Sequence, residues 1–200
     1  MADFNANYRI AEGRMMKHRL ITGVCALAFT LIGSGASAQT RPVDSIDQTE
    51  TLASLGPSAV LPALSVATAN QVVEVQADGT PFVSATASNG LLMQMYFTAC
   101  DDGGQTGCKG MSIVSVWPRV AEETVPAVAA ATRSFLLDHP LANAGQFDDN
   151  RPYFSRYVIA DYGIAQGNLL SEFSNFIRGA TEFHNMLAGI EGGLGAPDAQ

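Results

Sequence analysis

Two cysteines, Cys100 and Cys108, are the residues of this chain best suited to covalent chemistry. They are separated by seven residues, and the third cysteine, Cys25, lies far from them in the N-terminal part. In an oxidising compartment such a pair forms a disulfide. A structural zinc site needs more ligands than two sulfurs without a nearby histidine, and a redox-active pair more often has two intervening residues. We therefore predict a structural disulfide, which would stabilise the fold by about 2–3 kcal/mol.

Histidine could serve as a base, but the two histidines beyond residue 38 lack the setting for it. Nucleophilic catalysis needs an activated Ser or Cys within reach of a base. His139 follows a predicted helix, where a cation interacts favourably with the helix dipole, and His184 falls on the flank of the last helix. No Gly-x-Ser-x-Gly motif is present. We predict capping or surface roles for both histidines, no catalytic residue and no enzymatic activity.

Clustered carboxylates are the remaining chemical feature. Asp101-Asp102 and Asp148-Asp149 could offer oxygen ligands to calcium, but a calcium loop spaces its acids at alternate positions and adds a late Glu. Acidic residues are also common in turns. We predict simple turns, with no metal and no cofactor. The alternative is an exported hydrolase, which would bring Asp148, Asp149 and Asp161 into one cleft and raise the pKa of one acid.

Residues 16–38 have the pattern of an export signal. A basic start is followed by an apolar run over residues 20–32 and by the small-x-small motif Ala36-Ser37-Ala38. The run is shorter than the roughly 20 residues of a membrane span. We expect cleavage between Ala38 and Gln39 and a periplasmic or secreted protein with no stable membrane span. Residues 1–15 would then be an upstream extension.

The charge balance argues against two classes of partner. Without residues 1–38, which hold four basic and two acidic residues, the formal net charge changes from −8 to −10. Such a charge opposes binding to nucleic acid and to anionic lipid. We predict a flexible segment over residues 39–51, one domain over 52–190 and a disordered tail over 191–200.

Periodicity and turn residues predict an α+β fold in which helices cover one face of an antiparallel sheet. The turns at Asp78-Gly79 and Asn89-Gly90 should be tight two-residue hairpin turns, and the predicted order of helices and strands is α-β-β-β-β-α-β-β-α. The predicted helices are residues 52–66, 124–137 and 169–190, and the predicted strands are residues 71–77, 81–87, 91–99, 110–117, 145–147 and 153–161.

The third strand is apolar on both faces. Met93, Met95 and Phe97 alternate with Leu92 and Tyr96, whereas a solvated face of an antiparallel sheet should be polar. This pattern indicates either core packing or an outer face that is partly covered by a partner protein, a second copy or a loop. The predicted contact residues are Leu92, Gln94, Tyr96 and Thr98. A small-ligand binder, the third class considered, would show a sizeable pocket between sheet and helices.

Several of these segments together resemble the YbjN family of bacterial sensory transduction regulators. The resemblance runs from Leu52 to Leu187. It includes residues 96–100 followed by an acidic, Gly-rich loop and Cys108, then residues 147–149 before a strand, and the closing helix with Phe173 and Phe176. It implies a fold similar to type III secretion chaperones and a regulatory or chaperone-like, protein-binding role. The family brings no established catalytic residues.

Overall fold

The computed structural model describes residues 40–101, 106–140, 142–191 and 194. The predicted extension, the signal peptide and its cleavage site at Ala38 and Gln39 lie outside the described residues, as does most of the predicted tail.

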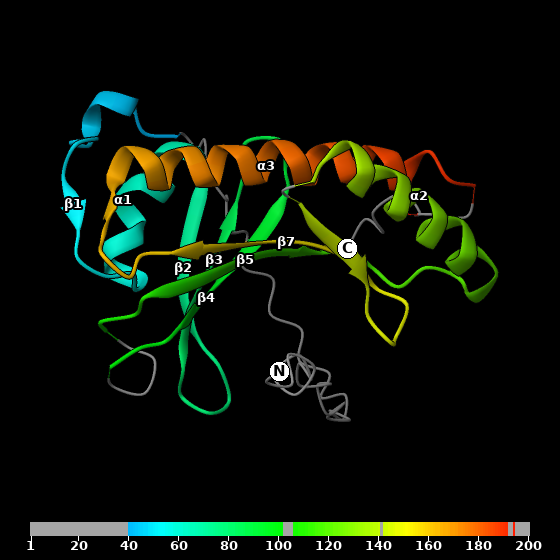
Figure 1. Cartoon of the computed structure of the whole chain (residues 1–200), viewed down its shortest axis with the longest axis horizontal. Coiled ribbons are helices and arrows are strands. Elements are labelled where there is room, and N and C mark those ends of the chain that lie inside the picture. The colour runs from blue at the N-terminus through cyan, green and yellow to red at the C-terminus, as the bar shows by residue number, and fades with distance from the viewer. Residues whose placement is uncertain (1–39, 102–105, 141, 192–193, 195–200) are drawn as a thin grey trace, which may run out of the picture. The chain divides into compact units, whose positions relative to one another are not determined.

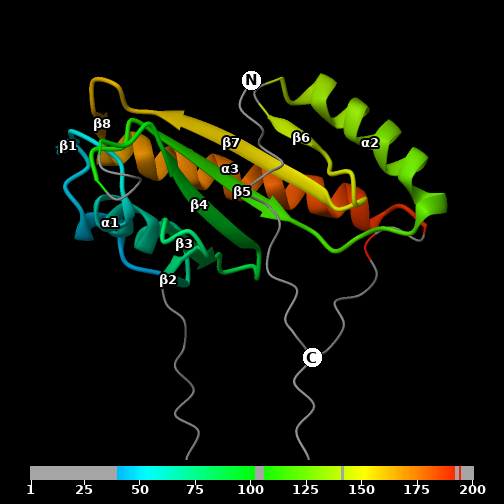
Figure 2. The same cartoon turned by 90° about the horizontal axis from the view of Figure 1, so that it is seen from below.

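A six-stranded antiparallel sheet forms the centre of the fold (Figures 1 and 2). Its strand order is β2-β3-β4-β5-β7-β6, and a separate two-stranded pair joins β1 to β8. The strands are β1 Thr51–Leu52, β2 Asn70–Val75, β3 Pro81–Thr86, β4 Leu92–Thr98, β5 Gly110–Val116, β6 Asn143–Gln146, β7 Pro152–Ile159 and β8 Ile164–Ala165. The α+β class and the antiparallel pairing are confirmed, and so is the order of elements apart from the two-residue strands β1 and β8, which were not predicted.

Three α-helices accompany the sheet: α1 Pro57–Ala67, α2 Val125–Asp138 and α3 Gln166–Ala188. Short 3-10 helices, η1 Val43–Ser45 and η2 Glu122–Thr124, precede α1 and α2. Helix α3 lies along one face of the sheet and packs against α1 and β7, whereas α2 packs against β6 and α3 (Figure 1). Among the described residues no helix lies on the other face, which Figure 2 shows in front of α3.

The core forms between α3 and the covered face of the sheet. Helix α3 has apolar residues every three or four positions, so that they form one stripe. Strand β4 alternates, which points Met93, Met95 and Phe97 toward the helix. The buried residues of the α3 stripe are Leu169, Phe173, Phe176, Ala180, Phe183 and Leu187. Both periodicities confirm the faces predicted from the sequence.

The first helix is shorter than predicted. Residues 52–56 are not helical, because Leu52 pairs with Ile164 in the two-stranded sheet and Leu55 exchanges two backbone hydrogen bonds with Cys108. Helix α1 begins at Pro57, whose missing N–H is tolerated in a first turn. Just before it, the carbonyl groups of Gln48 and Glu50 accept hydrogen bonds from the start of α3. The segment predicted to be a loose lead-in therefore contacts α3.

The hairpin turns differ from the predicted two-residue type. In three hairpins a four-residue turn ends on a single residue with positive φ, namely Gly79 (88°), Gly90 (86°) or Asn150 (65°). Each of these residues donates its N–H to the carbonyl three residues earlier. The carbonyl of the residue that follows it accepts the N–H of the first residue of the turn. This is a type I turn followed by a left-handed residue. This turn needs one residue with positive φ, whereas a two-residue type I′ turn needs two.

Side-chain bonds reinforce the first of these turns. The Asp78 carboxylate accepts a hydrogen bond from the Thr80 backbone N–H at 2.9 Å. Bonds from the Thr80 backbone and hydroxyl hold the pKa of Asp78 below its ordinary value. An acid in this turn therefore serves the local backbone.

Candidate functional site

Cys100 and Cys108 form a disulfide, as predicted. Cys108 is fully buried, and its backbone pairs with Leu55 just before α1. The covalent link therefore fastens the end of β4 to a residue that also anchors the approach to α1. Within the described ranges, no cluster of three or more His, Cys, Asp or Glu side chains could hold a metal ion.

The four predicted contact residues lie in a row on the face of β4 that points away from α3. Leu92 is 60% exposed, whereas the Tyr96 side chain is half-buried. The Tyr96 hydroxyl donates to Gln94 Oε1 at 2.9 Å, and its ring stacks on Phe82 with centroids 5.4 Å apart. Thr98 Oγ1 lies 2.8 Å from the Tyr157 hydroxyl. The row is thus tied to β3 on one side and reaches β7 across β5 on the other.

This face carries no charged side chain on its four central strands. The register places 15 residues there, which we call the open face: Phe82, Ser84, Thr86, Leu92, Gln94, Tyr96, Thr98, Gly110, Ser112, Val114, Val116, Tyr153, Ser155, Tyr157 and Ile159. Leu92, Tyr157 and Ile159 are exposed, whereas Gly110, Ser112, Val114 and Ser155 are buried. On a chain of net charge −8, these 15 residues carry no charge and include Phe82 and three tyrosines.

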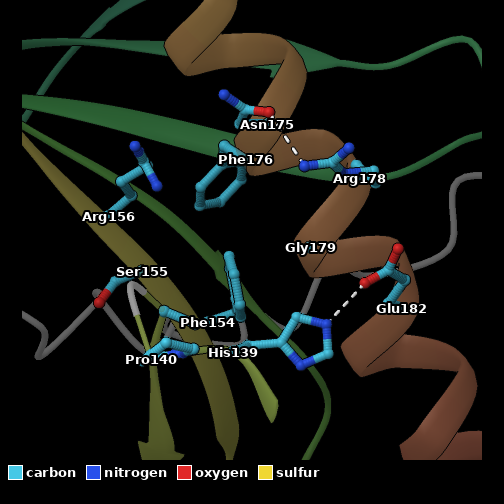
Figure 3. Close-up of a pocket in the computed structure, with 11 residues that line it drawn as sticks. His139, Pro140, Phe154, Ser155, Arg156, Asn175, Phe176, Arg178, Gly179 and Glu182 are labelled. Atoms are coloured by element: carbon cyan, nitrogen blue, oxygen red, sulfur yellow. Dashed lines mark hydrogen bonds and ion pairs between the residues drawn. The ribbon is translucent and has the colours of Figure 1, made fainter. Parts of the chain in front are cut away.

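A second feature is a hollow of about 440 Å³ between β7 and α3 (Figure 3). Phe154 and Phe176 form its apolar part, with ring centroids 5.4 Å apart. Gly179 on α3 allows this packing, because a Cβ there would lie 2.8 Å from Phe154 Cζ. Arg156, which also lines the hollow, donates from Nε to the Glu172 carboxylate on α3. The hollow thus combines an aromatic wall with a guanidinium group.

His139 caps α2, as predicted, and also joins it to α3. Its Nδ1 lies 3.0 Å from the Phe135 carbonyl oxygen, and its ring stacks on Phe135 at 4.0 Å. Its Nε2 lies 2.9 Å from Glu182 Oε2, the contact drawn in Figure 3. Both neighbours are acceptors, so both bonds form only when the imidazole is protonated.

His184 is half-buried and lies against the Trp117 ring, with centroids 6.2 Å apart. Within the described residues its Nδ1 is buried and makes no hydrogen bond. It lines a hollow of about 720 Å³ at the end of β4 and β5, to which Leu92 also contributes. This setting agrees with the predicted place of His184 between core and surface.

The three acids of the hydrolase alternative do not converge. Asp148 and Asp149 lie in the turn before β7, and Asp161 follows its end. An eight-residue strand spans roughly 25 Å. Asp149 instead accepts from Arg151, whose Nε lies 2.7 Å from Asp149 Oδ2. The predicted turn role of Asp149 is supported, and the shared cleft is wrong.

Sequence reasoning missed Arg156 and its partner Glu172. Arg156 occupies a helix-facing position of β7, between Phe154 and Val158, which are both buried. The available signal was the alternation of the strand, which predicts an apolar side chain at position 156. A charged side chain at such a position needs a partner. Glu172 could not be paired with it without knowing that α3 crosses β7.

Comparisons with known proteins identify no family. No family model matches the chain, and no curated protein matches it. Among solved structures, the chain is similar to an uncharacterized protein from Methanothermobacter thermautotrophicus, with a TM-score of 0.36 and 10% sequence identity over 57% of this chain and 84% of that one. No helix in the described part of the chain combines the length and the apolar character that a membrane span requires.

Proposed function

We propose that this chain is an exported, non-enzymatic protein-binding module whose open face contacts a partner protein. The observation that carries the proposal is the absence of charge across the 15 residues of that face. Monomeric proteins seldom leave large apolar patches in water, and interface cores are depleted in charge and enriched in Tyr and Phe.

Export and the regulatory role belong to the same proposal. The disulfide supports an oxidising location such as the periplasm, because such bonds persist there and are rare in the cytosol. The export pattern of residues 16–38 supports it independently. The resemblance to the YbjN family, with its type III secretion chaperone-like fold, supports a chaperone-like or sensory regulatory role.

Replacing Leu92 and Tyr96 together with serine should abolish partner binding while the chain stays folded. The change removes an exposed apolar side chain and an aromatic ring from the β4 row of the open face. The measurement is photo-cross-linking in intact cells from a probe at Ile159, an exposed residue of the open face that the double change leaves in place, with the captured protein identified by mass spectrometry. Circular dichroism checks the fold of the variant.

Leu137 provides the matched control, because it is apolar, 80% exposed and located on α2, away from the open face. A probe at Leu137 should not capture the protein that is captured from Ile159, and Leu137→Ser should leave binding unchanged. Equal capture from both positions, or capture that survives the double substitution, would contradict the proposal.

A second candidate function, the binding of a small ligand, is favoured by the hollow of about 440 Å³ between β7 and α3. Its apolar wall and Arg156 suit an aromatic carboxylate: the ligand ring would lie against the edge of Phe154, and the guanidinium, which already pairs with Glu172, would also bond to the acid group. This function would be compatible with a partner on the open face, because Phe154 and Phe176 lie on the helix side of the sheet.

Phenylacetate is a suitable probe for this second function. Its titration should shift NMR resonances of residues around Phe154 and Phe176, and Arg156→Gln should weaken binding about tenfold through the loss of a charge-assisted hydrogen bond. Arg151→Gln, which changes an arginine paired with Asp149 in the preceding turn, is the control. No shift at millimolar probe would exclude this ligand class.

A further inference from the structure

The two edges of the six-stranded sheet differ sharply. Strand β6 has four residues and α2 packs against it, whereas β2 has six residues and pairs only with β3. Figure 2 shows β2 and β6 at opposite sides of the sheet, with α2 beside β6. No strand among the described residues pairs with the outer edge of β2. An edge of this length is usually covered or protected by charge.

Strand β2 carries little of that protection. Val72, Val73 and Val75 are 52%, 47% and 66% exposed, although α1 contacts this strand. Valine favours strand structure, and the segment holds neither Lys, Arg nor Pro, the residues that most often prevent pairing at an edge. Glu74 is its one charged residue. The strand is therefore suited to receive another strand.

The direction of the free backbone groups follows from the register. Gln76 donates its N–H to Thr80, and the same register continues as Val75 opposite Pro81 and Glu74 opposite Phe82. In an antiparallel pair every second residue bonds to the neighbouring strand. Glu74 and Val72 thus bond toward β3. The backbone groups of Gln71, Val73 and Val75 point away from the sheet.

We propose that two copies of this chain pair β2 with β2, antiparallel, about a two-fold axis that passes between the Val73 residues of the two copies. In this register Val73 faces the same residue of the second copy and Gln71 faces Val75. These are three hydrogen-bonded pairs, each exchanging two backbone bonds. The axis is perpendicular to the sheet, so both open faces lie on the same side of one continuous sheet.

The composition of β2 favours a second copy as the occupant, because self-pairing places the exposed Val73 against Val73, a pair of β-branched residues that suits neighbouring strands. In the proposed register Glu74 lies opposite Val72 of the second copy, so the two Glu74 carboxylates are not placed against each other. A client peptide would be selected by pockets for its alternate side chains, and neither of the hollows described above is lined by a residue of β2. The inference stands independently of the partner proposed for the open face.

Cross-linking through introduced cysteines tests both the interface and its register. Hydrogen-bonded antiparallel residues have Cα atoms about 5.5 Å apart, within the range that a disulfide spans. Val73→Cys should therefore give a covalent dimer under mild oxidation. Val72→Cys, of similar exposure but opposite Glu74 in this register, should cross-link at least roughly tenfold more slowly. Equal rates for the two variants would overturn the proposed register.

A second measurement determines the mass in solution of the unsubstituted chain from residue 39 onward, and with it the oligomeric state. Light scattering should show a dimer, and Val73→Pro should shift it toward the monomer by at least about tenfold in dissociation constant, because proline removes an outward N–H that β3 does not use. Leu92→Ser with Tyr96→Ser should leave the dimer intact, which separates this interface from the open face. A monomer without substitutions, or a dimer unaffected by Val73→Pro, would overturn the inference.

Discussion

Replacing Phe183 with alanine should lower the free energy of unfolding by about 3–5 kcal/mol, as expected for the loss of a fully buried aromatic ring. Its ring contacts Trp117, with centroids 5.4 Å apart, and Phe135, with centroids 5.2 Å apart. A third ring, Phe154 on β7, lies at 6.0 Å. Because these neighbours come from α2, β7 and the segment after β5, the cavity would weaken the packing of α2 against the rest of the domain.

Urea unfolding monitored by Trp117 fluorescence measures this change. His184→Ala is the control, since His184 is the next residue on α3, is half-buried, and its buried Nδ1 has no hydrogen bond to lose among the described residues. It should cost less than about 1 kcal/mol. A Phe183→Ala variant within 1 kcal/mol of the parent protein would show that the cluster of rings does not hold α2 in place.

Replacing Cys100 and Cys108 together with alanine should lower the free energy of unfolding by about 2–3 kcal/mol. The cross-link restricts the unfolded chain, and its loss also removes the buried Cys108 side chain from its place beside Leu55. Reductant should destabilise the unsubstituted protein by a similar amount and leave the double variant unchanged. A double variant as stable as its parent would contradict this account of the disulfide.

The same bond provides a test of location. Both cysteines should resist alkylation in material taken directly from the periplasm and react only after reduction. Free thiols at both positions in native cells would contradict the proposed export. The outcome is independent of the stability measurement, because a bond can be stabilising in vitro and still be absent in the cell.

Local patterns were sufficient wherever a single element determines the direction of its own side chains. The alternation around Met95 and Tyr96 and the stripe through Phe173 and Phe176 predicted the buried faces of β4 and α3, as the structure has them. The tight turns were placed correctly but assigned the wrong type. The reason is that Asp-Gly and Asn-Gly suit several turns, and loop length, which depends on strand pairing, selects among them.

Features that join distant segments could not be predicted in this way. The true start of α1 depends on Leu52 meeting Ile164, and the hollow depends on Phe154 of β7 lying against Phe176 of α3. The bare edge at β2 depends on the whole strand order, since only that order shows which strand is left with one neighbour.

The sequence by itself determined the α+β class, the order of elements, the disulfide pair and the two faces of β4, because side-chain periodicity and cysteine number are local properties. The tertiary structure alone decided that Asp149 and Asp161 lie apart, that 15 charge-free residues share one face, and that β2 forms an open edge. The physical reason is that these properties arise from pairing between segments far apart in the chain, which no local pattern encodes.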